Sequence, residues 1–494
     1  MHYPQTWLLA VLSLSSYVSA FYPYNRDNNG KSQRAEKRFY PIAQAAQSRN
    51  GVVKVDVHKV PVQKRDNQFS VVLSNPATSG PNALAIHQDG SDYSYFSTFR
   101  FGSQGQEMFM LIDTGSANTW VFSSDCLSET CSIHNTFGKE DSTTLKTTTN
   151  TWDLAYGTGA VSGIVGSDTV KFANFSINLG FGLATNASSD FDGYPMDGIL
   201  GLGRRSSGNL GTPTIMDVLD DQANLAQNVV GVHLHRAADG SKDGEILFGG
   251  IDTAKFAGTL AYTKTANDNS WEIPVDDILV GGAPCSFTDR TAIIDTGTSF
   301  ILLPPADAQA MHKLIPGSAA SGESFTVPCN TGANLEVKIN GKLYQISPRD
   351  YVGKPVQGST TICGSNIVGH QAFGPKQWIL GDVFLKNVYA VFDFDGKQIG
   401  FGFPGSGGSI SASSSSNATS GTISSSTTAT VSASTSNSRS SASTSNGAQP
   451  SSTQSTDSTL GQSASTGGGQ KTVIEPWKIA FLIALAFVIG CIDV

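Results

Sequence analysis

The chain has 494 residues, 39% of them hydrophobic and 15% charged, and a formal net charge of −8 at pH 7. This length allows two to three domains. The acidic balance gives no indication of a nucleic-acid partner, and we expect none.

The first 20 residues have the pattern of a secretory signal peptide. The stretch from Trp7 to Leu14 is apolar, and Val18-Ser19-Ala20 is a small-residue cleavage signature. No Lys or Arg precedes the apolar stretch, which is a modest departure from that pattern. We therefore expect the mature protein in an oxidising compartment, where cysteines pair.

The segment that follows, residues 21–65, is basic. It contains ten Lys or Arg and three Asp or Glu, a net charge of +7, which leaves −15 for residues 66–494. We interpret it as a prosegment that Coulomb attraction holds across an anionic cleft and that protonation of carboxylates would loosen. Lys64-Arg65 predicts a dibasic processing site, and Lys37-Arg38 is a second candidate. The alternative is a solvated basic linker.

One short motif occurs twice in the chain. Residues 111–116 read Leu-Ile-Asp-Thr-Gly-Ser, and residues 293–299 read Ile-Ile-Asp-Thr-Gly-Thr-Ser. In each copy the apolar run predicts a buried strand, and the Asp-Thr-Gly predicts a tight loop at its end. A single copy would be most simply a turn. Two copies predict two similar lobes, each of which contributes one carboxylate to a cleft.

If the two loops face each other, Asp113 and Asp295 lie within hydrogen-bonding reach of one water. Two carboxylates that close cannot both ionise cheaply, so they share one proton and the apparent pKa values of the pair split. A base and an acid then lie side by side, which suits the addition of water to an amide.

Further motifs indicate the same organisation. Residues 152–159 (Trp-Asp-Leu-Ala-Tyr-Gly-Thr-Gly) alternate and then turn, which is typical of a hairpin tip. Residues 196–203 are expected to close the core of the first lobe, and residues 378–384 and 388–393 that of the second. With the two Asp-Thr-Gly copies, these motifs resemble the pepsin family of aspartic endopeptidases over roughly residues 85–404. The resemblance implies a mostly β, bilobal pepsin-like fold with an active-site cleft between two related lobes.

The resemblance also implies roles for individual residues. Asp113 and Asp295 are the expected catalytic pair, and Tyr156 lies on a flap over the substrate with Trp120 as its partner. Ser116 and Thr298 are expected to hydrogen-bond the outer oxygens of the two aspartates. By residue type alone, the two aromatic residues would more often belong to a core. The expected substrate-binding residues are Leu111, Gly115, Ser116, Trp120, Tyr156, Gly157, Thr158, Met196, Ile199, Gly297, Thr298 and Ser299.

Six cysteines are present. The family resemblance implies disulfides Cys126–Cys131 and Cys329–Cys363, although the sequence alone allows other pairings. Cys285 has no evident mate and is expected to be a small buried thiol. Cys491 lies in the apolar C-terminal tail, which maturation is expected to remove.

The C-terminal part differs in composition from the rest. Residues 406–469 consist mainly of Ser, Thr, Ala and Gly, which predicts a disordered, O-glycosylated stalk because such a segment cannot bury enough apolar surface to fold. N-glycosylation acceptors occur at Asn174, Asn186 and Asn417.

The chain ends with features of a GPI-attachment signal. Small residues at 467–469 precede a polar spacer and an apolar run at 479–489, and we expect the lipid on Gly467 or a neighbour within residues 465–468. The alternative is a transmembrane helix, but residues 479–494 are fewer than the roughly 20 that span a bilayer.

These inferences divide the chain into six parts. They are a signal peptide (1–20), a prosegment (21–65), an N-terminal lobe (66–260), a C-terminal lobe (261–404), a stalk (405–470) and a GPI-attachment propeptide (471–494). This combination is typical of a fungal enzyme held on the plasma membrane or in the cell wall, or shed from it.

We therefore expect a monomeric endopeptidase that cuts peptides or proteins at acidic pH, prefers apolar residues and needs no metal or cofactor. The prosegment would be an intramolecular inhibitor. One alternative is a yapsin-like protease that cuts after Lys or Arg, with Asp190 and Asp192 as candidate recognition residues. Another is a pepsin-fold binding protein without catalysis, which is disfavoured because both aspartates and the flap tyrosine are present.

Overall fold

The structure is a computed structural model that describes residues 67–157, 159–204, 209–223 and 225–405. The expected signal peptide, prosegment and GPI-attachment signal lie outside these residues, as do Thr158, Asn417 and Gly467. Among the described residues, no helix combines the length and apolar character that crossing a bilayer requires.

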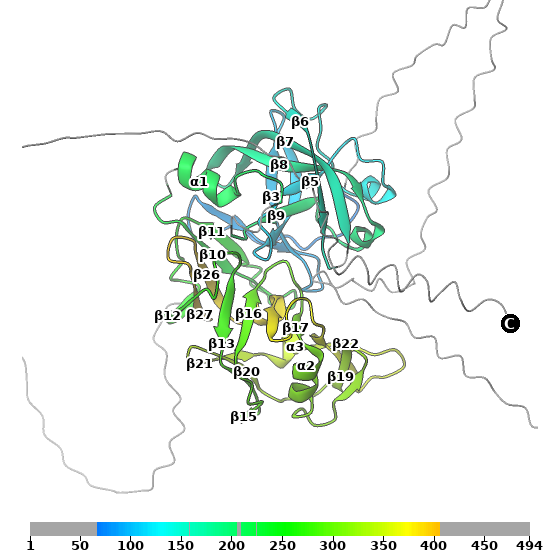
Figure 1. Cartoon of the computed structure of the whole chain (residues 1–494), viewed down its shortest axis with the longest axis vertical. Coiled ribbons are helices and arrows are strands. Elements are labelled where there is room, and N and C mark those ends of the chain that lie inside the picture. The colour runs from blue at the N-terminus through cyan, green and yellow to red at the C-terminus, as the bar shows by residue number, and fades with distance from the viewer. Residues whose placement is uncertain (1–66, 158, 205–208, 224, 406–494) are drawn as a thin grey trace, which may run out of the picture. The chain divides into compact units, whose positions relative to one another are not determined.

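The N-terminal part of the chain forms an eight-stranded sheet, which occupies the upper half of the body in Figure 1. Its strands, in spatial order, are β2 (His87–Gln88), β3 (Tyr95–Phe101), β4 (Gln106–Asp113), β9 (Gly198–Gly201), β5 (Trp120–Phe122), β8 (Phe175–Ala187), β7 (Ala160–Phe172) and β6 (Lys146–Ala155). Strands β3 and β7 also pair, so the sheet curls back on itself and encloses an aromatic core.

The C-terminal part builds three smaller sheets, in the lower half of Figure 1. The five-stranded sheet has the order β13 (Glu272–Val275), β16 (Arg290–Ile294), β25 (Gln377–Leu380), β17 (Ile301–Leu303), β24 (Ile367–Gly369). One four-stranded sheet is β15 (Ala283–Pro284), β14 (Asp277–Val280), β20 (Leu335–Ile339), β21 (Lys342–Ile346). The other is β18 (Ala319–Ser321), β19 (Ser324–Pro328), β23 (Ile362–Ser365), β22 (Val352–Pro355).

A six-stranded sheet contains strands from both parts of the chain. Its order is β1 (Ala83–Ala85), β11 (Glu245–Phe248), β10 (Val229–His233), β26 (Tyr389–Asp393), β27 (Gln398–Pro404), β12 (Phe256–Lys264). The antiparallel pairing of β10 with β26 therefore joins the two halves through backbone hydrogen bonds. The expected lobe boundary at residues 260/261 falls inside β12.

Helices are short and few among the described residues. They are α1 (Ile215–Ala223), α2 (Pro305–His312), α3 (Pro348–Tyr351), α4 (Asp382–Leu385) and the 3-10 helices η1 (Glu129–Ile133) and η2 (Ser189–Gly193). The predicted mostly β fold is thus confirmed.

The two halves repeat one arrangement of three strands. In the first half, β4 pairs in parallel with β9, and β9 pairs antiparallel with β5. In the second half, β16 pairs in parallel with β25, and β25 pairs antiparallel with β17. The duplicated apolar runs of the sequence supply β4 and β16, so the repeat in sequence corresponds to a repeat in topology.

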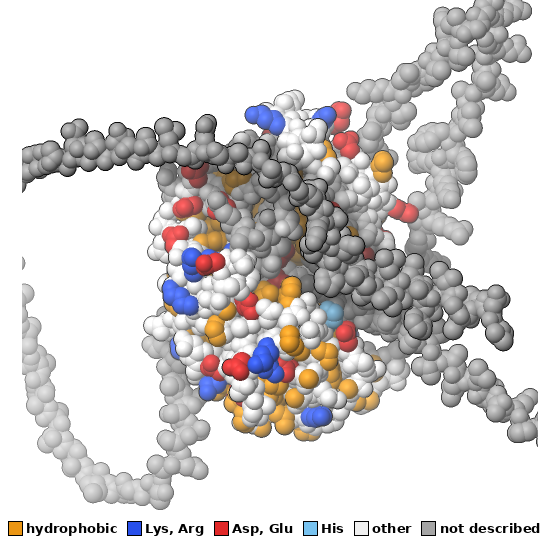
Figure 2. Space-filling model, in the orientation of Figure 1, with side chains coloured by type: hydrophobic (Ala, Val, Ile, Leu, Met, Phe, Trp, Pro, Cys, Tyr) orange, Lys and Arg blue, Asp and Glu red, His pale blue; other side chains and the backbone are white. Residues whose placement is uncertain are grey.

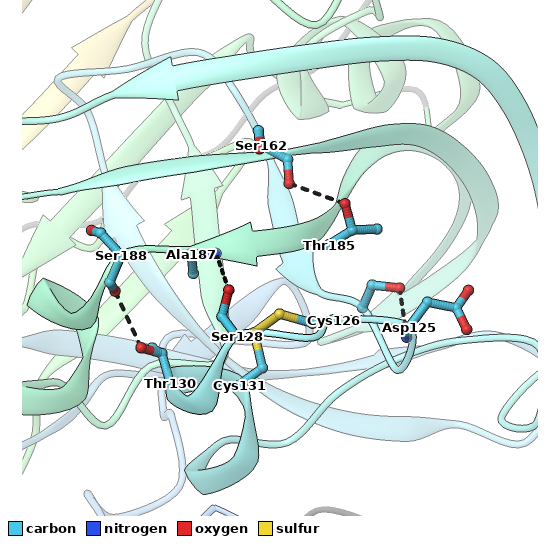
Figure 3. Close-up of a disulfide and its surroundings, with 10 residues drawn as sticks. Asp125, Cys126, Ser128, Thr130, Cys131, Ser162, Thr185, Ala187 and Ser188 are labelled. Carbon is cyan, nitrogen blue, oxygen red and sulfur yellow. Dashed lines mark hydrogen bonds between the residues drawn. A yellow bond between two sulfur atoms is a disulfide. The ribbon is translucent and has the colours of Figure 1, made fainter.

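Both predicted disulfides are confirmed. The short loop between Cys126 and Cys131 lies against the end of β8 (Figure 3), where the Ser128 hydroxyl accepts from the Ala187 backbone N–H at 3.0 Å. The Thr130 hydroxyl of the loop donates to Ser188 O at 3.3 Å, and the Ser188 hydroxyl accepts from the Ala160 N–H at 3.0 Å, so the loop contacts the residue that holds the start of β7. Cys285 is in no disulfide and is only partly buried, rather than fully buried as expected.

On the face drawn in Figure 2, the acidic and basic side chains of the described residues are interspersed. The visible part of the body therefore carries its charge as a mixed surface.

A fully buried carboxylate, Asp197, lies where β9 begins. Its Oδ1 accepts from the Asn67 side chain and the Asn135 backbone, and its Oδ2 accepts from the Phe109 backbone and the Asn135 side chain, all at 2.8 Å. Burial raises the pKa of Asp197 to about 6, although these hydrogen bonds oppose the shift.

The imidazole of His134 lies beside this carboxylate. Its Nδ1 is 3.9 Å from Asp197 Oδ1, and the ring stacks between those of Phe69 and Phe122. Burial lowers the pKa of His134 to about 4. The buried pair therefore binds its first proton on the carboxylate, whereas the unfolded chain binds it on the imidazole.

Removing one partner at a time should give opposite pH dependences of the free energy of unfolding. In His134→Phe, the remaining Asp197 has a raised pKa. Its contribution to the free energy of unfolding is therefore fully present below pH 3.8, the ordinary pKa of the group, and is lost as pH rises through about 6. In Asp197→Asn, the remaining His134 has a lowered pKa, so stability is present above 6.5 and is lost as pH falls through about 4.

Each change should amount to about 3 kcal/mol across its window. In the wild type the two effects compensate, because the folded and unfolded pairs both bind one proton near pH 6 and another near pH 4. Urea titrations between pH 3.5 and 7.5 measure these slopes. Equal slopes in the wild type and both variants would contradict the conclusion that the buried pair binds its first proton on Asp197 rather than on His134.

Candidate active site

The two duplicated aspartates meet between the halves of the body. Asp113 is the last residue of β4, and Asp295 follows directly after β16. Both are buried, with 4% and 6% of their surface exposed. The parallel pairing of each strand with its Ile-Leu-Gly neighbour sets the position of the loop that carries the carboxylate.

The threonines that follow the aspartates join the two loops. The Thr114 hydroxyl donates to Ile294 O at 2.8 Å and accepts from the Thr296 N–H at 3.0 Å. Reciprocally, the Thr296 hydroxyl donates to Ile112 O at 2.7 Å and accepts from the Thr114 N–H at 3.1 Å. These four bonds are buried, so the relative position of the two loops is fixed by polar contacts that exclude water.

The glycines of the two motifs allow the carboxylates to approach. A Cβ atom on Gly115 would lie 2.6 Å from the Asp295 carboxyl, and a Cβ atom on Gly297 would lie 2.6 Å from Asp113 Oδ1. Each carboxyl group therefore packs against the glycine of the opposite loop. Any side chain at either position would push the two loops apart.

Each carboxylate is oriented by the same set of donors. The Gly115 N–H donates to Asp113 Oδ1 at 2.8 Å, and the Ser116 hydroxyl donates to Oδ2 at 2.6 Å. In the second loop, the Gly297 N–H and the Thr298 hydroxyl make the corresponding bonds to Asp295 at 2.8 and 2.6 Å. The two carboxyl groups are within hydrogen-bonding reach of each other, and both line the cavity described below.

Burial and the neighbouring carboxylate raise the pKa of Asp113 well above its ordinary value. Burial is the larger cause, followed by the charge of Asp295, while the hydrogen bonds from Ser116 and Gly115 oppose the shift. Because two adjacent buried carboxylates do not ionise together, the pair retains one proton. The site therefore presents a proton donor and a proton acceptor side by side.

A hairpin formed by β6 and β7 reaches over these loops. Its turn is closed by a bond from the Tyr156 N–H to Gly159 O at 2.7 Å. The Tyr156 hydroxyl accepts from Trp120 Nε1 at 2.8 Å, and its ring meets the edge of Phe191. Burial and the charge of Asp113 raise the pKa of Tyr156, so the hydroxyl is neutral at acidic and neutral pH.

A cavity of about 250 Å³ lies between the hairpin and the two loops. Of the expected site residues, it is lined by Asp113, Gly115, Ser116, Tyr156, Gly157, Asp295 and Gly297. The other expected residues that the structure describes are buried behind this surface: Leu111, Trp120, Met196, Ile199, Thr298 and Ser299. Tyr156 packs against the cluster that contains Leu111, Trp120, Met196 and Ile199, so these four support the wall of the cavity.

Several lining residues were not expected from the sequence. They are Asn118, Leu154, Ala155, Asn209, Ile293, Phe373 and Ile379. The duplication offered a signal for Ile293, because it occupies the position that Leu111 has in the first copy. Phe373 carried no such signal, since it lies in a loop; it is an exposed aromatic residue that contributes to the lining of the cavity.

Within the described ranges, no three His, Cys, Asp or Glu side chains converge as a metal site would require.

The family model described as eukaryotic aspartyl protease matches residues 94–403. The chain belongs to this family. Both Asp-Thr-Gly loops and the hairpin of Tyr156 lie within the matched residues.

Several named proteins are similar to this chain in sequence. The aspartic-type endopeptidase ctsD of Aspergillus fumigatus is 47% identical over 411 residues, which cover 80% of this chain and 86% of that protein. A probable aspartic-type endopeptidase CTSD of Trichophyton verrucosum is 50% identical over 68% of this chain and 66% of the relative. Pepsin A of Bos taurus is 34% identical over 63% of this chain and 85% of its own length. This aspartyl protease is therefore an aspartic-type endopeptidase.

Replacing Thr114 should show how much of the stability of this aspartyl protease depends on the contact between the loops. Thr114→Val keeps the shape but leaves the buried Thr296 N–H and Ile294 O without partners, which should lower the free energy of unfolding by about 2–4 kcal/mol. Thr114→Ser keeps the hydroxyl and should cost about 1 kcal/mol or less. Urea unfolding at one fixed pH compares the two. Equal losses would mean that the hydroxyl contributes nothing.

Proposed function

We propose that Asp113 and Asp295 together activate one water for peptide-bond hydrolysis at acidic pH. The observation that carries this proposal is the reciprocal packing of each carboxyl group on the glycine of the opposite loop. This contact brings two buried carboxyl groups together with one proton between them.

The mechanism follows from that protonation state. The ionised carboxylate takes a proton from the water as its oxygen bonds to the scissile carbonyl carbon. The protonated partner donates a hydrogen bond to the carbonyl oxygen and stabilises the charge that develops there. A proton then passes to the amide nitrogen, the carbon–nitrogen bond breaks, and one water has been added with no covalent enzyme intermediate.

Tyr156 and Trp120 contribute by closing the site. The bond between the indole N–H and the tyrosine hydroxyl holds the hairpin over the cavity. A covered site excludes bulk water, which strengthens the electrostatic interactions of the carboxyl pair.

Removing either carboxylate should abolish the acid–base pair. We expect Asp113→Asn and Asp295→Asn each to lower kcat by roughly 10²–10⁴-fold, because an amide cannot exchange the shared proton. Asp220→Asn, at an exposed position of α1, is the matched control and should keep full activity. The assay is hydrolysis of a peptide at acidic pH with circular dichroism to verify folding. Full activity in either active-site variant would refute the assignment.

For substrate choice, we propose a preference for apolar side chains beside the scissile bond. Ile293, Ile379 and Phe373 line the cavity near Asp295, and Leu154 lines it on the hairpin. Contact with these surfaces would favour an apolar residue through burial of its side chain.

A yapsin-like preference for Lys or Arg is the second candidate. Asp190 and Asp192 are exposed on η2, and a Cβ atom on Gly159 of the hairpin turn would lie 3.1 Å from the Asp190 Cβ. Digestion of a peptide library distinguishes the two preferences by the residues that flank the cut. A pepsin-fold protein without catalysis would give no pepstatin-sensitive cleavage at all.

We further propose that the enzyme is made as a secreted precursor and displayed by a GPI anchor. The signal-like first 20 residues, the basic segment ending in Lys64-Arg65 and the C-terminal apolar run support this. Asn174 and Asn186 are exposed and are the two proposed N-glycan sites within the described residues. Mass spectrometry of the mature termini, with and without phospholipase release, tests the processing and the anchor.

A further inference from the structure

An extended segment precedes the first strand of the six-stranded sheet. Residues 67–80, here called the amino-terminal strap, begin two residues after Arg65, where the prosegment is expected to end. Along the strap, Val72 exchanges backbone hydrogen bonds with Gln88, and the Asn75 N–H donates to Lys242 O at 2.8 Å. The Thr78 N–H donates to Glu245 of β11 at 2.6 Å. The strap thus connects the Asp197 region with the edge of the shared sheet.

The first residues of the strap lie on Asp197. The side-chain amide of Asn67 donates to Asp197 Oδ1 at 2.8 Å and to Pro195 O at 2.5 Å. The Asn67 backbone N–H donates to Asn135 Oδ1 at 3.0 Å, and the ring of Phe69 stacks on His134. The two side-chain bonds bridge 128 and 130 residues of sequence, so the strap braces the segment just before β9 from outside.

Asp197 connects that segment to the catalytic strand. Its N–H donates to Phe109 O at 2.7 Å, and its carboxylate accepts from the Phe109 N–H at 2.8 Å. Phe109 is on β4, the strand that ends at Asp113, and the next residue of that strand pairs with Gly198. Met196 and Ile199, on either side of Asp197, belong to the cluster on which Tyr156 packs.

We propose that Asn67 is a positioning residue for the reaction. Through Asp197, it fixes the register of β4 with β9 and the position of the hydrophobic cluster on which Tyr156 packs. The inference rests on the proposed function of Asp113 and Asp295. It implies that the cut that removes the prosegment must leave Asn67 attached, because a mature chain that began later would lose this contact.

Kinetics of the processed enzyme test the role of Asn67. Asn67→Ala removes the two bonds that the side chain donates to Asp197 and Pro195, and also the bond that its Oδ1 accepts from the Phe69 N–H. It should lower kcat/KM for an apolar peptide about tenfold, since small displacements of positioning groups reduce productive binding. Ser70→Ala, at an exposed position of the same strap, is the matched control and should be unchanged. Equal kcat/KM values for the two variants would overturn the proposal.

Asn67→Asp provides a readout that a merely structural role would not give. Its carboxylate would face Asp197 and could share a proton with it in acid, but not after both ionise. The other titratable groups here are His134, which lies beside Asp197, and Asp89 and Asp192, which line a cavity with Gln68 and Phe69. Asn67→Asp should therefore retain activity near pH 4. Between pH 4 and pH 6.5, its activity should fall by a factor at least tenfold larger than the factor for the wild type. A pH profile parallel to that of the wild type would contradict the proposal.

Hydrogen exchange separates this proposal from the proposed function. In Asn67→Ala, amides at residues 107–111 and 196–200 should exchange faster than in Ser70→Ala, whether or not the protein cleaves peptides. Unchanged exchange would overturn the positioning role. If the wild type cleaves no peptide but exchange still differs between Asn67→Ala and Ser70→Ala, only the catalytic assignment is refuted.

Discussion

The structure depends on one contact between two loops that are far apart in the sequence. Asp113 and Asp295 are buried against each other's glycines, and Thr114 and Thr296, the residues that follow them, make four buried hydrogen bonds between the two loops. Two adjacent carboxylates in a buried site repel each other and lose hydration, so such a pair persists only if it keeps a proton and if its surroundings are fixed. The threonine contact supplies that fixed geometry. The same conditions create an acid and a base at one place.

The surrounding fold supports this contact from several directions. The repeated pairings of β4 with β9 and of β16 with β25 position the two loops, and the shared sheet joins the halves that carry them. Trp120 and the cluster under Tyr156 hold the hairpin above the cavity. Asp197 links the cluster under Tyr156 to β4, and the amino-terminal strap covers Asp197. Residues remote from the carboxyl pair thereby contribute to its geometry.

The sequence predicted much of this arrangement because the determining motifs are local. Each Asp-Thr-Gly follows an apolar strand, so the two related lobes and the two carboxylates could be inferred from the residues themselves, whereas the fold class and both disulfides were implied by the resemblance to the pepsin family. The lining by Phe373 and Asn209 could not, because their positions depend on how loops pack across the cavity. The contact of Asn67 with Asp197 spans 130 residues and has no periodic pattern, so no local signal indicated it. Cys285 illustrates the same limit, because its partial exposure depends on neighbouring strands.

The most direct test of the central claim is to follow the protons of the pair. NMR titration of protein with ¹³C-labelled aspartate carboxyl groups, compared with Asp113→Asn and Asp295→Asn to assign the signals, reports how the two carboxyl groups ionise. If the pair shares a proton, it loses its two protons in two widely separated steps, and either substitution abolishes this splitting. Two independent carboxyl groups that titrate together in the ordinary range of aspartate would contradict it.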